Sequence, residues 1–176
     1  MIITFDFFFV PVSMLMGLLV FGLAAKWYYL PWARRRSLRD AATPILLLHA
    51  TRYIGLGFLV TGLVSPLLDQ TFAKSAAYGD FVAACLAFIA LYFLRRGAGS
   101  AKAWLWLFSV AGVADLITAV GLGITHIKPA TIDGMYFIPV LGVPLLFASH
   151  VALMVLLFRS ATSTVRESGD LLPQKY

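Results

Sequence analysis

The 176-residue chain is 61% hydrophobic and only 12% charged, with a mean hydropathy of +0.89. Soluble domains are about 25% charged, so this composition excludes an ordinary water-soluble protein and predicts an integral membrane protein. The formal net charge of +6 could suit a nucleic acid, but the basic residues flank apolar runs. We therefore predict contact with membrane lipids and no nucleic-acid partner.

Five apolar runs are each long enough to cross about 30 Å of hydrocarbon as a helix. They lie approximately at residues 8–30, 43–66, 76–94, 103–124 and 135–158. The runs are continuous and lack the alternating pattern of membrane-barrel strands. The sequence therefore predicts an all-α fold, with a single five-helix transmembrane domain over residues 1–159 and a polar cytoplasmic tail over residues 160–176.

Basic residues are distributed unevenly between the two sides of these runs. One side carries a cluster that begins at Lys26 and covers residues 34–39, together with Arg95, Arg96, Lys102, Arg159, Arg166 and Lys175. The other side has only Lys74 and Lys128. Because cytoplasmic loops are enriched in Lys and Arg, we predict an external N-terminus and a cytoplasmic C-terminus. This pattern is typical of a multi-pass protein of the bacterial inner (plasma) membrane.

The ends of the second and third runs carry capping signals. Thr43 and Pro44 are expected to begin the second helix, because proline is favoured in a first turn. Asp69 and Asp80 are interpreted as interfacial caps near the outer end of the third helix, with an outer-face cation site as the alternative. The third run also has a small-residue face on which helices can approach closely, formed by Ala76, Asp80, Ala83, Ala84 and Ala87.

Four polar side chains lie deep within the predicted helices. His49 and Arg52 are three residues apart and share one helical face, and Asp115 and His150 lie in the fourth and fifth runs. Charged groups in a bilayer are costly and usually face a protein interior. Small residues surround Asp115 on its face of the helix, which indicates that Asp115 points toward another helix.

Arg52 and Asp115 are predicted to form a buried ion pair, because an unpaired guanidinium in hydrocarbon is very costly. Their estimated depths differ by about 6 Å, a gap that an arginine side chain can span. Such a pair could fix the register of the helices, or it could belong to a functional site. The residue types leave both roles open.

The two histidines allow three interpretations. His49 and His150 could ligate heme b from its two faces, with Arg52 holding a propionate. Alternatively, His49, His150 and Asp115 could supply a two-histidine, one-carboxylate metal site. In the third interpretation each imidazole finds an ordinary hydroxyl or backbone partner, such as Thr51 or Ser149. His126 is expected in an outer loop, away from this group.

These residues support three hypotheses for the function. The first is a heme b protein for electron transfer, or a membrane redox subunit, which the histidine pair favours. The second is a transport or proton-relay protein that acts as an oligomer, since five helices are few for a solitary transporter. The third is a non-catalytic accessory or assembly subunit of a larger membrane complex. No catalytic motif is present, so the sequence predicts neither catalytic residues nor a reaction.

Overall fold

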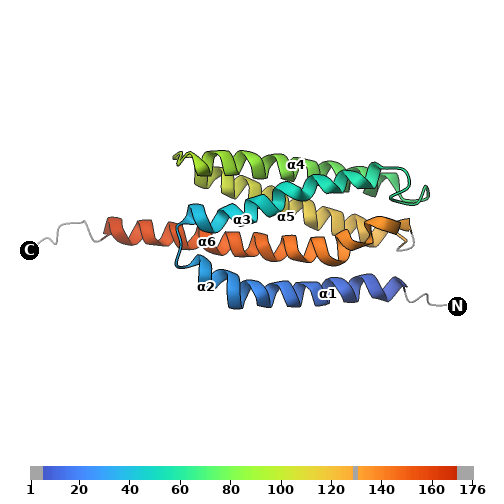
Figure 1. Cartoon of the computed structure of the whole chain (residues 1–176), viewed down its shortest axis with the longest axis horizontal. Helices are drawn as coiled ribbons and strands as arrows, with labels where there is room; N and C mark the ends of the chain where they lie inside the picture. The colour runs from blue at the N-terminus through green and yellow to red at the C-terminus, as the bar shows by residue number, and fades with distance from the viewer. Residues whose placement is uncertain (1–5, 129–130, 170–176) are drawn as a thin grey trace, which may run out of the picture.

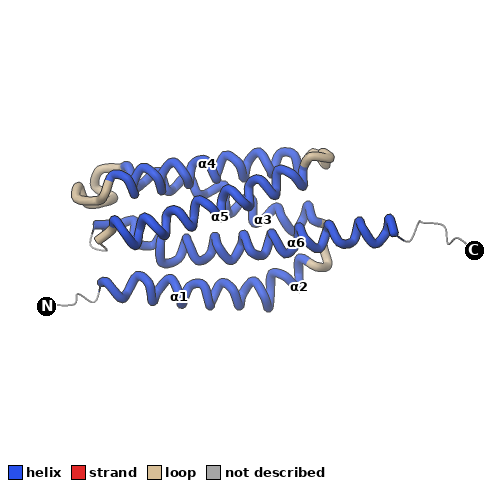
Figure 2. The backbone as a smooth tube through the Cα atoms, turned by 180° about the vertical axis from the view of Figure 1, so that it is seen from behind, coloured by secondary structure: helices blue, strands red, loops and turns tan. Residues whose placement is uncertain are grey.

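The computed structural model describes residues 6–128 and 131–169. It is a bundle of long helices that run along a common direction (Figures 1 and 2). No β-strand occurs in the described part of the chain, where Thr61 and Val64 form only an isolated bridge. The elements in chain order are α1 (Asp6–Ala24), η1 (Ala25–Tyr29), α2 (Leu30–Ala33), α3 (Leu38–Ala50), η2 (Thr51–Leu59), α4 (Gln70–Arg95), α5 (Ala101–His126), η4 (Asp133–Tyr136), η5 (Ile138–Gly142) and α6 (Val143–Gly169).

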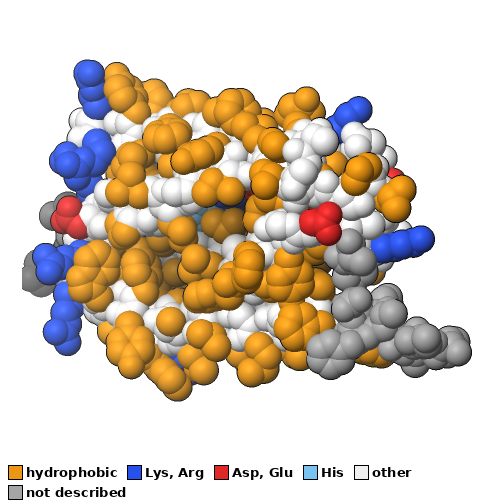
Figure 3. Space-filling model, turned by 45° about the vertical axis from the view of Figure 1, so that its right-hand side comes forward, with side chains coloured by type: hydrophobic (Ala, Val, Ile, Leu, Met, Phe, Trp, Pro, Cys, Tyr) orange, Lys and Arg blue, Asp and Glu red, His pale blue; other side chains and the backbone are white. Residues whose placement is uncertain are grey.

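Five helical spans among the described residues are long and apolar enough to cross a membrane. They are Phe8–Ala33, Leu38–Leu59, Gln70–Arg95, Ala101–His126 and Asp133–Ser160. The all-helical class and the five spans agree with the sequence prediction, and the composition of the spans suggests a membrane protein. Figure 3 shows hydrophobic side chains across the middle of the molecule and Lys or Arg at its two ends.

The second span differs from the prediction at both ends. Ser37 rather than Thr43 caps α3, because its Oγ accepts a hydrogen bond of 3.1 Å from the backbone N–H of Asp40. Thr43 and Pro44 therefore lie inside α3, and the expectation that they begin this helix was wrong. The helix also ends at Leu59 and does not reach Pro66, since Val60 is extended and Gly62 has a φ of +91°. Glycine adopts that left-handed conformation without strain.

Three of the five spans include turns that depart from α-helical geometry. The first span includes η1 and the fifth includes η5, which are both single π-helical turns, and the second span continues from α3 into the 3₁₀-helix η2. Such irregular turns inside longer helices are frequent at functional sites. All three spans border the site described below.

The helices are not equally buried. α4 and α5 pack closely on each other, η2 and α3 pack on α4, and α6 contacts α3 and α5. α1 lies at the edge of the bundle, where it packs on α6 and η5 (Figure 2). One apolar core is built around Leu46, Phe108 and Leu153, and a second around Phe58 and Phe72 near the opposite end. Four buried polar residues lie on these packed helices, namely His49, Arg52, Ser109 and His150.

Candidate functional site

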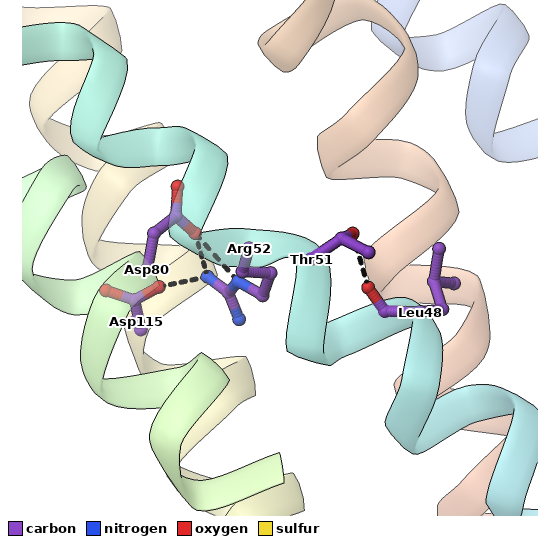
Figure 4. A network of polar contacts seen from close by, with 5 residues as sticks. All are labelled: Leu48, Thr51, Arg52, Asp80 and Asp115. Carbon is purple, nitrogen blue, oxygen red and sulfur yellow. Dashed lines mark hydrogen bonds and ion pairs between the residues drawn. The ribbon is translucent and has the colours of Figure 1, made fainter. Parts of the chain in front are cut away.

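Arg52 joins three helices through two carboxylates. It belongs to the first turn of η2, and its side chain is only 2% exposed. Its Nε donates a hydrogen bond of 2.7 Å to Oδ1 of Asp80 in α4, and its Nη2 lies 2.7 Å from the same oxygen. Nη2 also donates to Oδ2 of Asp115 in α5. Figure 4 shows the guanidinium pointing toward both carboxylates. One cation therefore connects η2, α4 and α5.

Glycines make the space that these polar side chains occupy. A Cβ on Gly55 would overlap the Asp80 carboxylate, and a Cβ on Gly79 would overlap the Asp115 carboxylate. A Cβ on Gly112 would overlap the His150 imidazole. In each case the glycine lies on the helix next to the one that carries the polar side chain. Glycine lets helix backbones approach closely in a membrane, and here it lets carboxylates and an imidazole enter the helix interfaces.

His49 and His150 are in direct contact across α3 and α6. Both are fully buried, and their ring centroids lie 4.1 Å apart at an interplanar angle of 49°. His49 Nε2 lies 2.8 Å from Ser149 Oγ, and His150 Nδ1 lies 3.4 Å from Ser109 Oγ. The Ser149 hydroxyl donates to the Leu146 carbonyl, so it accepts from His49 Nε2–H. Each imidazole therefore has a serine partner from another helix.

The ion-pair group and the histidine pair meet beside Gly112. His150 Nε2 and Arg52 Nη1 both lie within 3.5 Å of the position that a Cβ on residue 112 would occupy. Neither atom has a hydrogen-bond partner among the described residues, although both are buried, and the same holds for His49 Nδ1. We call the whole group the buried polar cluster, which comprises His49, Arg52, Asp80, Ser109, Asp115, Ser149 and His150.

The buried polar cluster is unbalanced in charge. One guanidinium and two ionised carboxylates give a formal charge of −1 when both imidazoles are neutral. An uncompensated charge in a low-dielectric interior is costly, so this arrangement favours the uptake of one proton or one monovalent cation. The side chains of Asp80 and Asp115 are 14% and 17% exposed, so both carboxylates are less deeply buried than the guanidinium.

Ser149 also borders an open apolar cleft. This lateral cleft has a volume of about 610 Å³ and lies between α1 with η1, α3 and α6. Its lining is apolar apart from a few polar atoms and includes Phe21, Tyr28, Tyr29, Trp32 and Leu145. Figure 3 shows the apolar surface hollowed on this side of the molecule. Because Ser149 bonds to His49, one edge of the buried polar cluster reaches the lateral cleft.

The histidine pair does not leave room for an iron in this arrangement. Two imidazoles that share one iron have ring centroids about 6 Å apart, because each Fe–N bond is about 2 Å long. The observed separation is 4.1 Å, so heme b would require the rings to move apart. No group of three or more His, Cys, Asp or Glu side chains in the described part of the chain is arranged to hold a metal ion. Heme and metal binding stay predictions.

Comparison with known families gives one match. A family model described as a domain of unknown function, DUF8737, matches residues 9–158. The chain belongs to this family. No curated protein and no solved structure matches it. The DUF8737 match covers the five spans except for Phe8 and the last two residues of the fifth, and it covers every residue of the buried polar cluster, so the site lies inside the family domain.

The structure of this DUF8737 member corrects one interpretation and adds two site residues, Asp80 and Ser109. Asp69 does cap α4, since its carboxylate accepts a 3.0 Å hydrogen bond from the Phe72 N–H. Asp80 is not an interfacial cap, because α4 begins at Gln70 and Asp80 lies ten residues inside it, paired with Arg52. Asp80 shares the small-residue face of its helix with Ala83 and Ala84, both buried. That shared face was a signal in the sequence from which a place for Asp80 in a helix interface could have been predicted.

Proposed function

We propose that the chain is a multi-pass protein of the cell inner (plasma) membrane that relays protons as part of transport. The observation that carries the proposal is the buried polar cluster, in which one arginine faces two carboxylates and lies next to two contacting histidines. Protonatable groups at membrane depth mark proton and ion pathways in pumps and transporters. The formal charge of −1 favours the uptake of a proton by this cluster.

The order of groups in the cluster supports a relay. A carboxylate of Asp80 or Asp115 accepts a proton, which neutralises the excess charge beside Arg52. His150 lies next to this group at Gly112, and an imidazole can take a proton on one nitrogen and release one from the other. His49 and Ser149 continue the line of polar atoms to the lateral cleft. Arg52 holds the carboxylates in position and keeps its own charge.

The charge distribution supports the proposed orientation in the membrane, and the low burial of the first helix supports assembly into an oligomer. The end of the bundle that carries residues 34–36, Arg95 and Arg96, called the basic end here, is proposed to face the cytoplasm, with the N-terminus outside. The first span, Phe8–Ala33, is hardly buried within one chain, since only 6% of its most apolar stretch is buried. This exposed face suits further contacts with lipid or with other copies, in keeping with an oligomer.

Proton flux into liposomes tests the relay. The purified chain is reconstituted into vesicles that contain a pH-sensitive dye, and a potassium diffusion potential drives protons inward. Wild-type protein should acidify the lumen, while Asp115→Asn and His150→Gln should reduce the flux at least about tenfold, since removing one group of a proton pathway typically costs that much or more. Asp69→Asn and His126→Gln are matched controls outside the cluster. Wild-type flux equal to that of empty vesicles would overturn the proposal.

Heme b binding, with electron transfer as its function, is the second candidate, because two buried imidazoles from different helices lie next to each other. It requires the two rings to move apart to admit an iron. The visible absorption spectrum of purified protein, isolated from cells supplied with a heme precursor, separates the two candidates. A Soret band that is lost in both His49→Gln and His150→Gln would favour heme. A featureless spectrum together with proton flux would favour the relay.

A further inference from the structure

The lateral cleft opens next to a pair of arginines at the basic end. Trp32 lines the cleft, and it also lines an adjoining pocket of about 480 Å³ formed with Pro31, Arg35 and Arg36. Arg36 lies over the Trp32 ring, with 5.8 Å between its guanidinium carbon and the ring centroid. The apolar cleft and the basic pocket are thus two parts of one surface that share a tryptophan.

The walls of the cleft are fixed by specific contacts. The Tyr29 hydroxyl donates a hydrogen bond to the Ala41 carbonyl, which ties η1 to α3 at the end of the cleft near Arg35 and Arg36. The π-helical turn η1 supplies three lining residues, namely Ala25, Tyr28 and Tyr29. The volume of about 610 Å³ lies within the usual range of ligand sites, about 300–1,000 Å³. The cleft is therefore a shaped surface with a charged mouth.

We propose that this surface binds one anionic membrane lipid, with its phosphate at Arg35 and Arg36 and its hydrocarbon chain in the lateral cleft. Charge complementarity identifies the occupant. Two guanidinium groups at the mouth match a phosphate, and the almost wholly apolar lining matches a hydrocarbon chain. A second helix would leave the arginines without a partner, and a soluble anion would leave the apolar cleft unfilled. The site meets the proposed proton relay only at Ser149, which lies at the inner edge of the cleft.

Brominated lipids provide the test, because bromine quenches tryptophan fluorescence only on close contact. A variant with Trp27→Phe, Trp104→Phe and Trp106→Phe keeps Trp32 as its single tryptophan. It is reconstituted into phosphatidylcholine vesicles that contain chain-brominated phosphatidylglycerol or, at the same mole fraction, chain-brominated phosphatidylcholine. We expect the anionic lipid to compete for contact with Trp32 about tenfold better than the zwitterionic lipid, since each arginine near the surface favours the anion.

Two changes to the site and two matched controls decide the result. Removing both mouth charges with Arg35→Gln and Arg36→Gln should abolish the preference for the anionic lipid. Filling the cleft with Ala148→Phe should also abolish it, while leaving the charges in place. Arg95→Gln with Arg96→Gln removes the other arginine pair at the basic end, where Arg96 covers Tyr92, and should change nothing. Val151→Phe adds the same bulk to an exposed position of α6 and should also change nothing.

These outcomes distinguish a lipid bound in the lateral cleft from a general attraction of anionic lipid to the basic surface. Equal quenching by the two lipids in the parent variant would overturn the proposal. A preference for the anionic lipid that persists in Ala148→Phe would also overturn it, because the arginines would then attract lipid without the cleft. Circular dichroism of each variant verifies that the helices are intact. If Ala148→Phe fails to fold, Ala24→Phe, on the α1 side of the cleft, serves in its place.

Discussion

Gly79 of α4 lies so close to the carboxylate of Asp115 in α5 that a side chain at residue 79 would overlap it. Gly79→Ala should therefore push Asp115 away from Arg52 and destabilise the protein by roughly 1–3 kcal/mol, as overpacking does elsewhere. Denaturant unfolding in detergent measures the loss. Gly121→Ala is the control, because nothing lies within 4 Å of that position, and it should be neutral or slightly stabilising. Equal stability of the two variants would contradict the close contact.

Arg52 should be the most costly residue of the buried polar cluster to remove. Arg52→Met leaves two carboxylates facing each other without a cation, and we expect a loss of roughly 3–5 kcal/mol. Asp115→Asn should cost less, because Asp80 still pairs with the guanidinium. Adding Asp80→Asn and Asp115→Asn to Arg52→Met should recover part of the loss, because no buried charge is then left unpaired.

A double-mutant cycle between Arg52→Met and Asp115→Asn measures this coupling through unfolding free energies. The cycle should be clearly non-additive, whereas the same cycle between Arg52→Met and Asp69→Asn should be additive, since Asp69 caps the start of α4 and does not contact Arg52. Additive losses in both cycles would mean that Arg52 and Asp115 do not communicate.

The number of spans could be predicted from the sequence because long apolar runs are a strong signal. The ends of the helices were harder to predict from the sequence. The signals at Thr43 and Pro44 resemble a helix start, yet Ser37 caps α3 two turns earlier and leaves both inside the helix. The length of η2 could not be predicted either, because it depends on the left-handed turn at Gly62 rather than on hydropathy.

Part of the candidate site could also be predicted from the sequence. Their positions inside the apolar runs single out His49, Arg52, Asp115 and His150 as polar groups deep in the helices. The structure places all four together with Asp80. Which atoms face which could not be predicted, because that depends on the spatial order of the helices. The placement of Ser109 and Ser149 against the two imidazoles is a contact of this kind.

Orientation in the membrane is predicted by the charges of the loops. Reporter fusions after Lys102 and after Arg166 should both report the cytoplasm, because both positions lie on the side that holds most of the basic residues. A fusion after Lys128 should report the opposite side and serves as the control. An external signal from either of the first two fusions would contradict the proposed orientation.

Asp69 should give α4 a pH-dependent cap. The hydrogen bond from the Phe72 N–H lowers the pKa of the Asp69 carboxyl below its usual 3.8. A pKa that is lower in the folded state means that the stabilisation is present above pH 3.8 and is lost as the pH falls through the folded pKa. Asp69→Asn keeps the cap acceptor without the charge. The melting temperatures of wild type and Asp69→Asn should therefore differ at neutral pH and converge in acid, and a constant difference would contradict this role.

Gly112 offers a way to separate a proton relay from a purely structural ion pair. A Cβ at this position would overlap His150, so Gly112→Ala should displace the imidazole from Arg52 while leaving the bonds of Arg52 to Asp80 and Asp115 in place. Proton flux into liposomes should then fall to the level of empty vesicles, while Gly121→Ala in the same helix should keep wild-type flux.

Loss of stability could lower the flux without any change in a relay, so a second variant removes the steric overlap. In Gly112→Ala with His150→Ala, the new methyl group has room, and the unfolding free energy should rise above that of Gly112→Ala alone. The flux should nevertheless stay at the background, because the imidazole that links the two halves of the buried polar cluster is gone. Wild-type flux in either variant would show that protons do not pass between the carboxylates beside Arg52 and His150, and the ion pair would then be a structural element of the bundle.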